Sequence, residues 1–149
     1  MSCEIRWSVA ADVDALAEVS RRSSLSNEGD RDLLLAHPEA LAFDGGHAQA
    51  GLTRVAMVDE RVVGYATLLP GDVAELEDLF VDPDWMRRGI GTALVEDAVT
   101  LARARNAPRI EVTANHHALH FYEAVGFVAV GTVVTPLGPL ASRMHLAVE

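Results

Sequence analysis

The spacing of apolar residues along the first half of the chain predicts one strand, two helical regions and three further strands. Apolar side chains alternate with polar ones in strands and recur every three to four residues in helices. On this criterion the expected elements are a strand at 5–9, a helix at 13–20, a helical region at 30–42 and strands at 52–58, 62–69 and 73–81. Asp12 is expected to cap the first helix, and His37-Pro38 to interrupt or end the second helical region. The short turn at 59–61 predicts an antiparallel hairpin.

The second half of the chain alternates between helices and strands. Its expected elements are a helix at 90–105, a strand at 110–113, a helix at 115–125 and strands at 127–134 and 144–148. Asn115 is expected to cap the second of these helices, and Gly126 to close it as a C-terminal cap. The complete order β-α-α-β-β-β-α-β-α-β-β predicts an α/β fold, a mixed sheet with helices on its faces.

Length and composition favour a single domain over residues 1–149. The chain has 149 residues, of which 50% are hydrophobic, and this is enough for one complete core. The longest loop-like stretch, 44–51, is expected to connect elements rather than domains. No apolar run approaches the roughly 20 residues that cross a bilayer, and the N-terminus lacks the layout of a signal peptide. Cys3 is the only cysteine, so no internal disulfide framework is possible, and a cytoplasmic protein is expected.

The charge balance argues against nucleic acid as a partner. The formal net charge is −10, and the twelve basic residues are scattered apart from Arg21-Arg22 and Arg87-Arg88. Binding to a phosphate backbone requires clustered Lys and Arg side chains. An acidic surface instead attracts cationic small molecules or protein segments over long distances.

Residues 79–94 carry the most specific pattern in the chain: an apolar strand end, a proline-containing turn, and a Gly-rich basic loop that opens a helix. Amide groups at a helix start have no intrahelical partner, and the helix dipole adds partial positive charge. Gly89 and Gly91 leave the backbone open to a pyrophosphate, while Arg87 and Arg88 add full charge. The pattern therefore predicts a site for a diphosphate ligand.

Neither of the two common phosphate loops fits this spacing. The chain contains no Gly-x-x-x-x-Gly-Lys-Ser/Thr run, and Leu94 stands where a dinucleotide fingerprint requires its third glycine. An ordinary solvated helix cap is the alternative interpretation of so short a glycine motif.

Two blocks of the sequence, 79–94 and 112–127, match the motifs of a known family. The first is similar to a pantetheine strand followed by a Gln/Arg-x-x-Gly-x-Gly/Ala loop, although Met86 occupies the position of Gln or Arg. The second is similar to an Asn-x-x-Ala-x-x-Phe-Tyr-x-x-x-Gly-Phe signature. Together they resemble the GNAT superfamily of acetyl-CoA-dependent N-acetyltransferases. The resemblance implies the acyl-CoA N-acyltransferase fold, with a mixed, mostly antiparallel sheet of six to seven strands flanked by about four helices.

The resemblance also assigns coenzyme-binding roles, with acetyl-CoA as cosubstrate and no metal. Main-chain groups of Leu79 and Val81, on either side of Phe80, would pair with the pantetheine amides like an added strand. Asn115 would reach the pantetheine carbonyl, and the Phe121-Tyr122 pair would place Tyr122 near the thioester sulfur. The amides that would hold the pyrophosphate belong to Arg87, Arg88, Gly89, Ile90, Gly91 and Thr92.

Transfer of an acetyl group to an amine requires a neutral nucleophile and a protonated leaving thiolate. Period-two alternation places Glu75 and Glu77 on the same strand face as Leu79, where either carboxylate could attract an ammonium and relay its proton. Solvated strand charges are the alternative for both, and Glu111 on the following strand is a further candidate base. Tyr122 is the candidate acid for the thiolate, because a phenol with a pKa of about 10 can donate a proton; a core aromatic is its alternative.

Two other groups of reactive residues are expected to stay outside the chemistry. His116 and His120 would share a helix face beside His117, but no acidic or cysteine partner stands near them in sequence. Surface or acceptor-pocket histidines are therefore expected rather than a metal site. Cys3 offers an acyl-cysteine route but lies away from both motifs.

The expected function is transfer of an acetyl group from acetyl-CoA to a primary amine of a small-molecule or peptide acceptor, by direct attack in a ternary complex. The alternatives are an acyl-CoA-binding or regulatory module on the same scaffold, and a nucleotide-binding fold of another kind. The segments 20–41 and 132–143 are expected to shape the acceptor pocket, but their residues identify no substrate. The stretch 137–140 is expected to be a rigid turn that borders this pocket or belongs to a homodimer contact.

Overall fold

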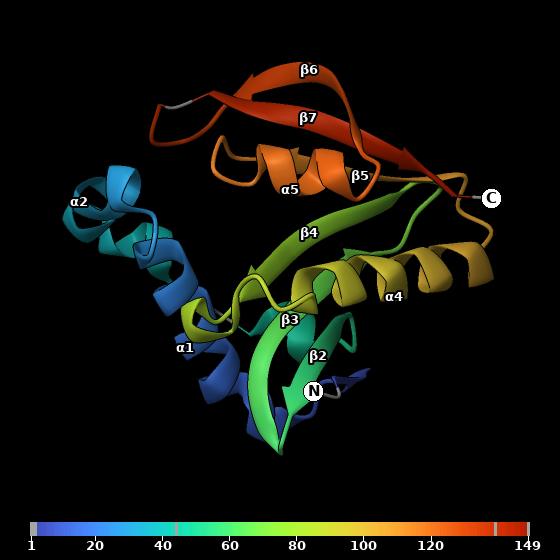
Figure 1. Ribbon diagram of the computed structural model, residues 1–149, viewed down its shortest axis with the longest axis horizontal. Coiled ribbons are helices and arrows are strands. Elements are labelled where there is room, and N and C mark those ends of the chain that lie inside the picture. Colours follow the sequence, from blue (N-terminus) through green and yellow to red (C-terminus); the bar gives the residue numbers. More distant parts are fainter. Residues whose placement is uncertain (1–2, 44, 139, 149) are drawn as a thin grey trace. The chain divides into compact units, whose positions relative to one another are not determined.

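The computed structural model describes residues 3–43, 45–138 and 140–148 (Figure 1). In these residues seven strands form one sheet in the order β1-β2-β3-β4-β5-β7-β6. The strands are β1 (Glu4–Trp7), β2 (Thr53–Val58), β3 (Arg61–Leu69), β4 (Ala74–Val81), β5 (Arg109–Ala114), β6 (Val128–Val134) and β7 (Leu140–Ala147). β4 and β5 pair in parallel, whereas β1 with β2, β2 with β3, β5 with β7 and β6 with β7 are antiparallel pairs. The predicted mixed, mostly antiparallel sheet is confirmed.

The described residues also form five α-helices and three short 3-10 helices. The α-helices are α1 (Val13–Leu25), α2 (Glu28–Ala36), α3 (Gly46–Gln49), α4 (Ile90–Ala104) and α5 (Leu119–Ala124). The 3-10 helices are η1 (Ala10–Asp12), η2 (Pro38–Leu41) and η3 (Pro83–Trp85). None of the helices in this part of the chain combines the length and the apolar character needed to cross a membrane.

The chain divides into two compact units. The N-terminal unit comprises Met1–Thr67 and Asp78–Leu94, and the C-terminal unit comprises Leu68–Glu77 and Val95–Glu149. Because the chain passes back and forth between the units, β3, β4 and α4 each contribute residues to both. The start of α4 therefore belongs to the N-terminal unit and the rest of that helix to the C-terminal unit.

In the N-terminal unit, α1 packs on the β1-β2-β3 sheet. Asp59 and Glu60 have φ values of +49° and +64°, the left-handed conformation that two-residue hairpin turns require, so the predicted hairpin of β2 and β3 is confirmed. A buried cluster joins the helix to the strands and consists of Leu16, Val19, Ala48, Val55 and Tyr65. Apolar residues at helical spacing on α1 and at alternate positions on β2 and β3 thus converge on one core.

The prediction that the side chain of Asp12 caps α1 is wrong. The carboxylate of Asp12 makes no cap hydrogen bond to α1; instead it accepts the N–H of Val9 at 2.8 Å. Arg6 donates to both oxygens of Asp12, at 2.8 and 2.9 Å, and these bonds hold the pKa of the Asp12 carboxyl below its ordinary value. Asp12 therefore ties β1 to the turn that precedes α1 rather than starting the helix.

The region after α1 follows the predicted break and adds one helix. α2 ends at Ala36 and η2 begins at Pro38, so the expected interruption at His37-Pro38 is confirmed. The stretch 44–51 was expected to be a loop, but residues 46–49 of it form the short helix α3, while Asp44 lies outside the described residues. Gly45, with φ +72°, precedes this helix, because a left-handed residue lets the chain turn sharply into it.

In the C-terminal unit, β5 lies between β4 and β7. Ile110 and Val112 on β5 and Met144 on β7 are buried, as expected for strands that are covered on one face. β7 begins at Leu140 rather than at the predicted residue 144, because the pairs formed with β6 and β5 extend the strand toward the hairpin. The rigid turn expected at 137–140 includes Pro139, which lies outside the described residues.

Candidate active site

The Gly-rich basic loop begins with a well-ordered turn at the end of β4. Asp82 caps η3: its carboxylate accepts the N–H of Asp84 at 2.9 Å, and its carbonyl accepts the N–H of Trp85 at 2.8 Å. The N–H of Asp82 donates to the carbonyl of Val63 on β3 at 2.8 Å, which anchors the turn to the sheet. Pro83 occupies the first position of η3, where its missing N–H costs nothing. The chain therefore leaves β4 in a fixed direction.

The loop then turns into α4 through two residues with left-handed backbones. Arg87 has φ +63° and Gly89 has φ +83°, and α4 begins at Ile90. An arginine in the left-handed region is strained, and backbone strain of this kind gathers at ligand-binding segments. Ala93 donates to the carbonyl of Gly89 at 3.0 Å and makes the first i−4 bond of the helix.

The amides that precede Ala93 lie at the start of α4. The first N–H groups of a helix have no i−4 carbonyl to bind, so they can serve as donors to an anion. Arg87, Arg88 and Gly89 are exposed, and α4 is 15 residues long, so its dipole adds positive potential at this end. The arrangement fits the predicted diphosphate site: backbone donors, a helix start and two guanidinium groups.

Positive side chains remain at the loop although Met86 occupies the position where the family has Gln or Arg. Met86 is 39% exposed and offers no strong hydrogen-bond donor. The guanidinium carbon of Arg88 lies 4.9 Å from the centre of the Trp85 ring, an arrangement that orients this charge by a cation–π contact. The loop therefore keeps an oriented guanidinium, that of Arg88, two residues after Met86.

At Gly64, the backbone of β3 packs closely against β4 and the first turn of α4. A Cβ atom added to Gly64 on β3 would lie 2.9 Å from the carbonyl oxygen of Phe80 and 3.4 Å from side-chain atoms of Ile90 and Leu94. β3 is thus packed against both β4 and the first turn of α4 at a distance that only glycine allows. Sequence analysis missed Gly64; the signal was an isolated glycine within an otherwise continuous strand pattern.

The strand residues that are predicted to pair with pantetheine lie next to Gly64 in the N-terminal unit. Leu79, Phe80 and Val81 form the last part of β4 and are half-buried. The ring of Phe80 packs against Tyr65, with the centroids 5.6 Å apart. This packing fixes the backbone of the segment whose main-chain groups are predicted to pair with pantetheine.

In the C-terminal unit, the predicted acidic residues form an ion cluster with Arg143 of β7. Glu75 of β4 stands opposite Glu111 of β5 in the parallel register. Arg143 donates through Nη1 to Glu75 at 2.8 Å and through Nη2 to Glu111 at 2.9 Å, and a second bond from Nη2 engages the other oxygen of Glu75. Nη1 of Arg143 also donates to Thr113 at 2.9 Å. One guanidinium therefore bridges two carboxylates on neighbouring strands.

This cluster changes the protonation behaviour of its members. Hydrogen bonds from Arg109, at 2.8 Å, and from Arg143 hold the pKa of the Glu111 carboxyl below its ordinary value. The hydrogen bond to Glu75 raises the pKa of Arg143 above its ordinary value. Sequence analysis missed Arg143 as a partner, since no local spacing connects β7 with β4. Glu77, by contrast, is exposed at the next outward position of β4.

Tyr122 lies on α5 between two other aromatic rings. Its ring meets those of Phe121 and Phe127 edge to face, with centroids 5.2 Å away in both cases. Tyr122 is 6% exposed, so its ring is part of the core of the C-terminal unit. Gly126, with φ +107°, closes α5 as predicted and turns the chain so that the N–H of Phe127 donates to the carbonyl of Tyr122 at 2.9 Å.

Asn115 shapes the turn that leads into α5. Its Oδ1 accepts the N–H of Ala118 at 3.0 Å and closes that turn. The predicted cap of the helix is wrong, because α5 starts only at Leu119 and its N-cap is Ala118, without a side-chain cap bond. The bond to Ala118 uses the acceptor of the side-chain amide and leaves the NH2 group as a donor. The amide group of Asn115 therefore has the chemistry expected of a partner for a pantetheine carbonyl.

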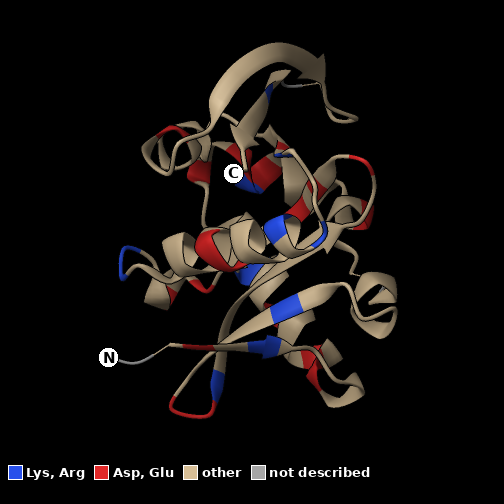
Figure 2. Cartoon of the chain, turned by 90° about the vertical axis from the view of Figure 1, so that its right-hand side faces the viewer, with Lys and Arg blue, Asp and Glu red and all other residues tan. Residues whose placement is uncertain are grey.

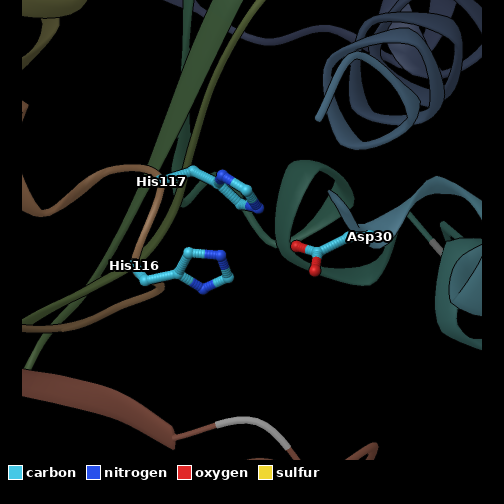
Figure 3. A group of neighbouring side chains, drawn as sticks. All are labelled: Asp30, His116 and His117. Atoms are coloured by element: carbon cyan, nitrogen blue, oxygen red, sulfur yellow. The ribbon is translucent and has the colours of Figure 1, made fainter. Parts of the chain in front are cut away.

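The histidines do not form the helical pair that their spacing suggested. His116 and His117 lie in the turn before α5, with ring centroids 3.9 Å apart (Figure 3). His120 is exposed on α5 and has Glu123 at 3.7 Å. His116 and His120 therefore do not share a helix face, because His116 precedes α5 and His120 lies on it.

The structure thus groups the predicted residues by unit. The loop residues 87–92 and the strand residues 79–81 lie in the N-terminal unit, whereas Asn115, Phe121, Tyr122, Glu75 and Glu77 lie in the C-terminal unit. Acidic and basic positions are interspersed along the chain (Figure 2), and several of them pair in the contacts described above. The loop carries the predicted diphosphate site, and the β4-β5-β7 strands carry two carboxylates and a guanidinium.

Comparison with known proteins shows similarity to N-acetyltransferases. The chain is 42% identical over 59 residues to an uncharacterized N-acetyltransferase of Methanocaldococcus jannaschii, a match that covers 38% of this chain and 26% of the relative. It is 34% identical over 89 residues to the ribosomal protein bS18-alanine N-acetyltransferase of Salmonella typhimurium, with 57% of this chain and 60% of the relative covered. The matches thus span only part of the length of these relatives.

Solved structures and a family profile extend the match over most of the chain. The crystal structure of the PaiA N-acetyltransferase from Thermoplasma acidophilum, in complex with coenzyme A, superposes with a TM-score of 0.77 at 20% identity and with 99% of each chain covered. At this identity the likeness shows the fold. The profile of the acetyltransferase (GNAT) family matches residues 14–127, a range that includes both motif blocks, 79–94 and 112–127, in full. The chain therefore belongs to the acetyltransferase (GNAT) family.

Proposed function

We propose that the chain transfers an acetyl group from acetyl-CoA to a primary amine, by direct attack of the amine in a ternary complex. The observation that carries the proposal is the exposed loop at the start of α4, where Arg87 and Gly89 take left-handed backbones and Arg87 and Arg88 add two guanidinium groups beside the helix N-terminus. Family membership supports the same conclusion, because the relatives are named N-acetyltransferases and the PaiA protein binds coenzyme A.

The residues present suit coenzyme A. The diphosphate would be held by the amides of 87–92, and the pantetheine arm by main-chain groups of Leu79 and Val81, in the manner of an added strand. The NH2 group of Asn115 would donate to a pantetheine carbonyl. When bound, acetyl-CoA supplies the acetyl group as a thioester, whose sulfur departs as the coenzyme thiol.

The chain must then move two protons. The acceptor amine loses one as its nitrogen forms the bond to the acetyl carbon, and the sulfur gains one as the carbon–sulfur bond breaks. The phenol of Tyr122 is the proposed donor to the sulfur, because it is the hydroxyl of the second motif. An acidic residue of β4, or water held by it, is the proposed acceptor of the amine proton.

Between the two bases predicted on β4, Glu75 and Glu77, the ion cluster favours Glu77. Both oxygens of Glu75 accept hydrogen bonds from Arg143, so the lone pairs that face Arg143 are already used. Glu77 is exposed, and its outward position follows that of Glu75 along the strand. We therefore assign proton removal to Glu77 and assign Glu75 to the ion cluster.

A second candidate function is an acyl-CoA-binding or regulatory module with little or no catalysis. The observation that favours it is the exposed Met86, which removes one side-chain donor from the coenzyme loop. Turnover distinguishes the two functions, because both bind the coenzyme and only the enzyme releases its thiol in proportion to added amine.

The test is an incubation of the protein with acetyl-CoA and a panel of amines, with free thiol measured over time. The panel contains a polyamine, an amino sugar, free amino acids and short peptides with a free N-terminus. The chain contains no lysine, so acetylation of its own side-chain amines adds no background. Amine-dependent thiol release supports the enzyme; coenzyme binding without release by any amine supports the binding module.

A further inference from the structure

Arg22, near the C-terminal end of α1, contacts the turn from which the coenzyme loop starts. Its Nε donates to Oδ2 of Asp82 at 3.1 Å, and its Nη2 donates to Oδ1 of Asp82 at 3.2 Å. Nη2 also donates to Oδ2 of Asp84 at 3.0 Å. These three bonds span about 60 residues of sequence, and all their members lie in the N-terminal unit.

Asp82, to which Arg22 donates two hydrogen bonds, also holds the turn at η3 together. Asp82 binds Val63 through its N–H, Trp85 through its carbonyl and Asp84 through its carboxylate. The side chain of Asp82 is 17% exposed and that of Arg22 is 39% exposed, so water is partly excluded from the carboxylate but not from the guanidinium. A bidentate guanidinium restricts the Asp82 carboxylate to one orientation and thereby fixes η3. Arg87 follows η3 after one residue, so the geometry of η3 sets the direction of the loop amides.

Charge gives Arg22 a second effect on the loop. Asp82 and Asp84 place two negative charges just before a segment that is proposed to bind a diphosphate. The chain as a whole already carries a net charge of −10, so an uncompensated pair of carboxylates here would repel the ligand further. The hydrogen bond to Asp82 raises the pKa of Arg22 above its ordinary value, so Arg22 carries its positive charge at neutral pH.

We propose that Arg22 is a positioning residue for coenzyme binding: it fixes the Asp82–Asp84 turn and neutralises its charge, so that the amides of 87–92 can accept a diphosphate. The inference rests on the proposed function, since it takes the diphosphate of coenzyme A as the ligand of the loop. Arg22 itself contacts no coenzyme atom in this account. It acts through the turn.

Arg22→Gln isolates this role, with Arg21→Gln as the matched control. Arg21 precedes Arg22 on α1 and is exposed, and its replacement changes the net charge equally. Calorimetric titration with CoA is expected to show roughly three- to tenfold weaker binding for Arg22→Gln and less than about twofold change for Arg21→Gln. Pantetheine, which lacks the diphosphate, is expected to bind the two variants and the unaltered protein equally.

Three further readouts separate positioning from a general loss of structure. The KM for acetyl-CoA should rise in Arg22→Gln while kcat at saturating coenzyme stays within about twofold, because the chemical step is untouched. Arg22→Lys should recover part of the affinity, since it restores the charge without the bidentate bond. Asp84→Asn, at a side chain that is 80% exposed, should tighten CoA binding by roughly twofold, because one repelling charge is gone.

Equal affinity of Arg22→Gln and the unaltered protein for CoA would overturn the inference. So would an equal loss of pantetheine binding in Arg22→Gln, because the effect would then not depend on the diphosphate. If the unaltered protein binds no CoA at millimolar concentration, the proposed function fails and the role of Arg22 fails with it. If the unaltered protein binds CoA and Arg22→Gln binds it as tightly as Arg21→Gln does, the proposed function stands and the inference about Arg22 alone is rejected.

Discussion

Replacement of Gly64 by alanine tests the close packing of β3 against β4 and the start of α4. The added Cβ would lie 2.9 Å from the carbonyl oxygen of Phe80, a separation that real Cβ atoms essentially never show, and 3.4 Å from Ile90 and Leu94 side-chain atoms. Backbone cannot move aside as a flexible side chain can, so β4 and the start of α4 must shift. Overpacking of this kind costs about 1–3 kcal/mol of unfolding free energy. For a chain of this length that corresponds to a fall in Tm of roughly 3–10 °C.

The assay is thermal unfolding followed by CoA titration, with Gly131→Ala as the control. Gly131 also lies in a strand, β6, but a Cβ there meets nothing within 4 Å. Gly131→Ala is therefore expected to leave Tm unchanged or slightly higher, because alanine reduces the entropy of the unfolded chain. Gly64→Ala should lower Tm and also weaken CoA binding, since the displaced helix start carries the loop amides. If Gly64→Ala has the Tm and the CoA affinity of the unaltered protein, position 64 does not require glycine and the start of α4 does not depend on this contact.

Three further predictions concern single side chains. Tyr122→Phe should lower kcat by at least tenfold with CoA affinity within about twofold, because only the proton donor is lost; equal turnover would remove Tyr122 from the mechanism. Glu77→Gln should lower kcat more than Glu75→Gln, and the Glu75 variant should instead lower Tm; the reverse order would assign the base to Glu75. Asp12→Asn should destabilise the protein by about 1–2 kcal/mol at pH 7 through weaker bonds to Arg6. Because the folded-state pKa of Asp12 is lowered, this difference in unfolding free energy should persist above pH 4 and shrink as pH falls below it; denaturant titrations across that range check the sign.

Most of the fold was predictable because its signals are local. The hairpin of β2 and β3 depends on two turn residues, and the end of α5 depends on Gly126, whose positive φ favours glycine. The loop was predictable for the same reason: Gly89 and the arginines before it lie within a few residues of the helix they open. The structure confirms the mixed sheet that these elements build, and the likeness to the PaiA structure agrees with it.

What sequence analysis missed depends on contacts between distant segments. Arg143 reaches Glu75 across 68 residues, and Arg22 reaches Asp82 across 60, distances over which residue spacing carries no information. Asp12 was expected to cap α1, but Arg6 on β1 competes successfully for its carboxylate. In each case a guanidinium from another element decided the role of an acidic residue.

The central claim is that the amides at the start of α4 receive the diphosphate of coenzyme A. Two-dimensional amide NMR of the protein during titration with CoA, and separately with pantetheine, measures this residue by residue. We expect CoA to shift the amide signals of 87–92 most strongly and pantetheine to leave them nearly unmoved. Unchanged signals for 87–92 when CoA is saturating, or no response of the spectrum to millimolar CoA, would contradict the claim.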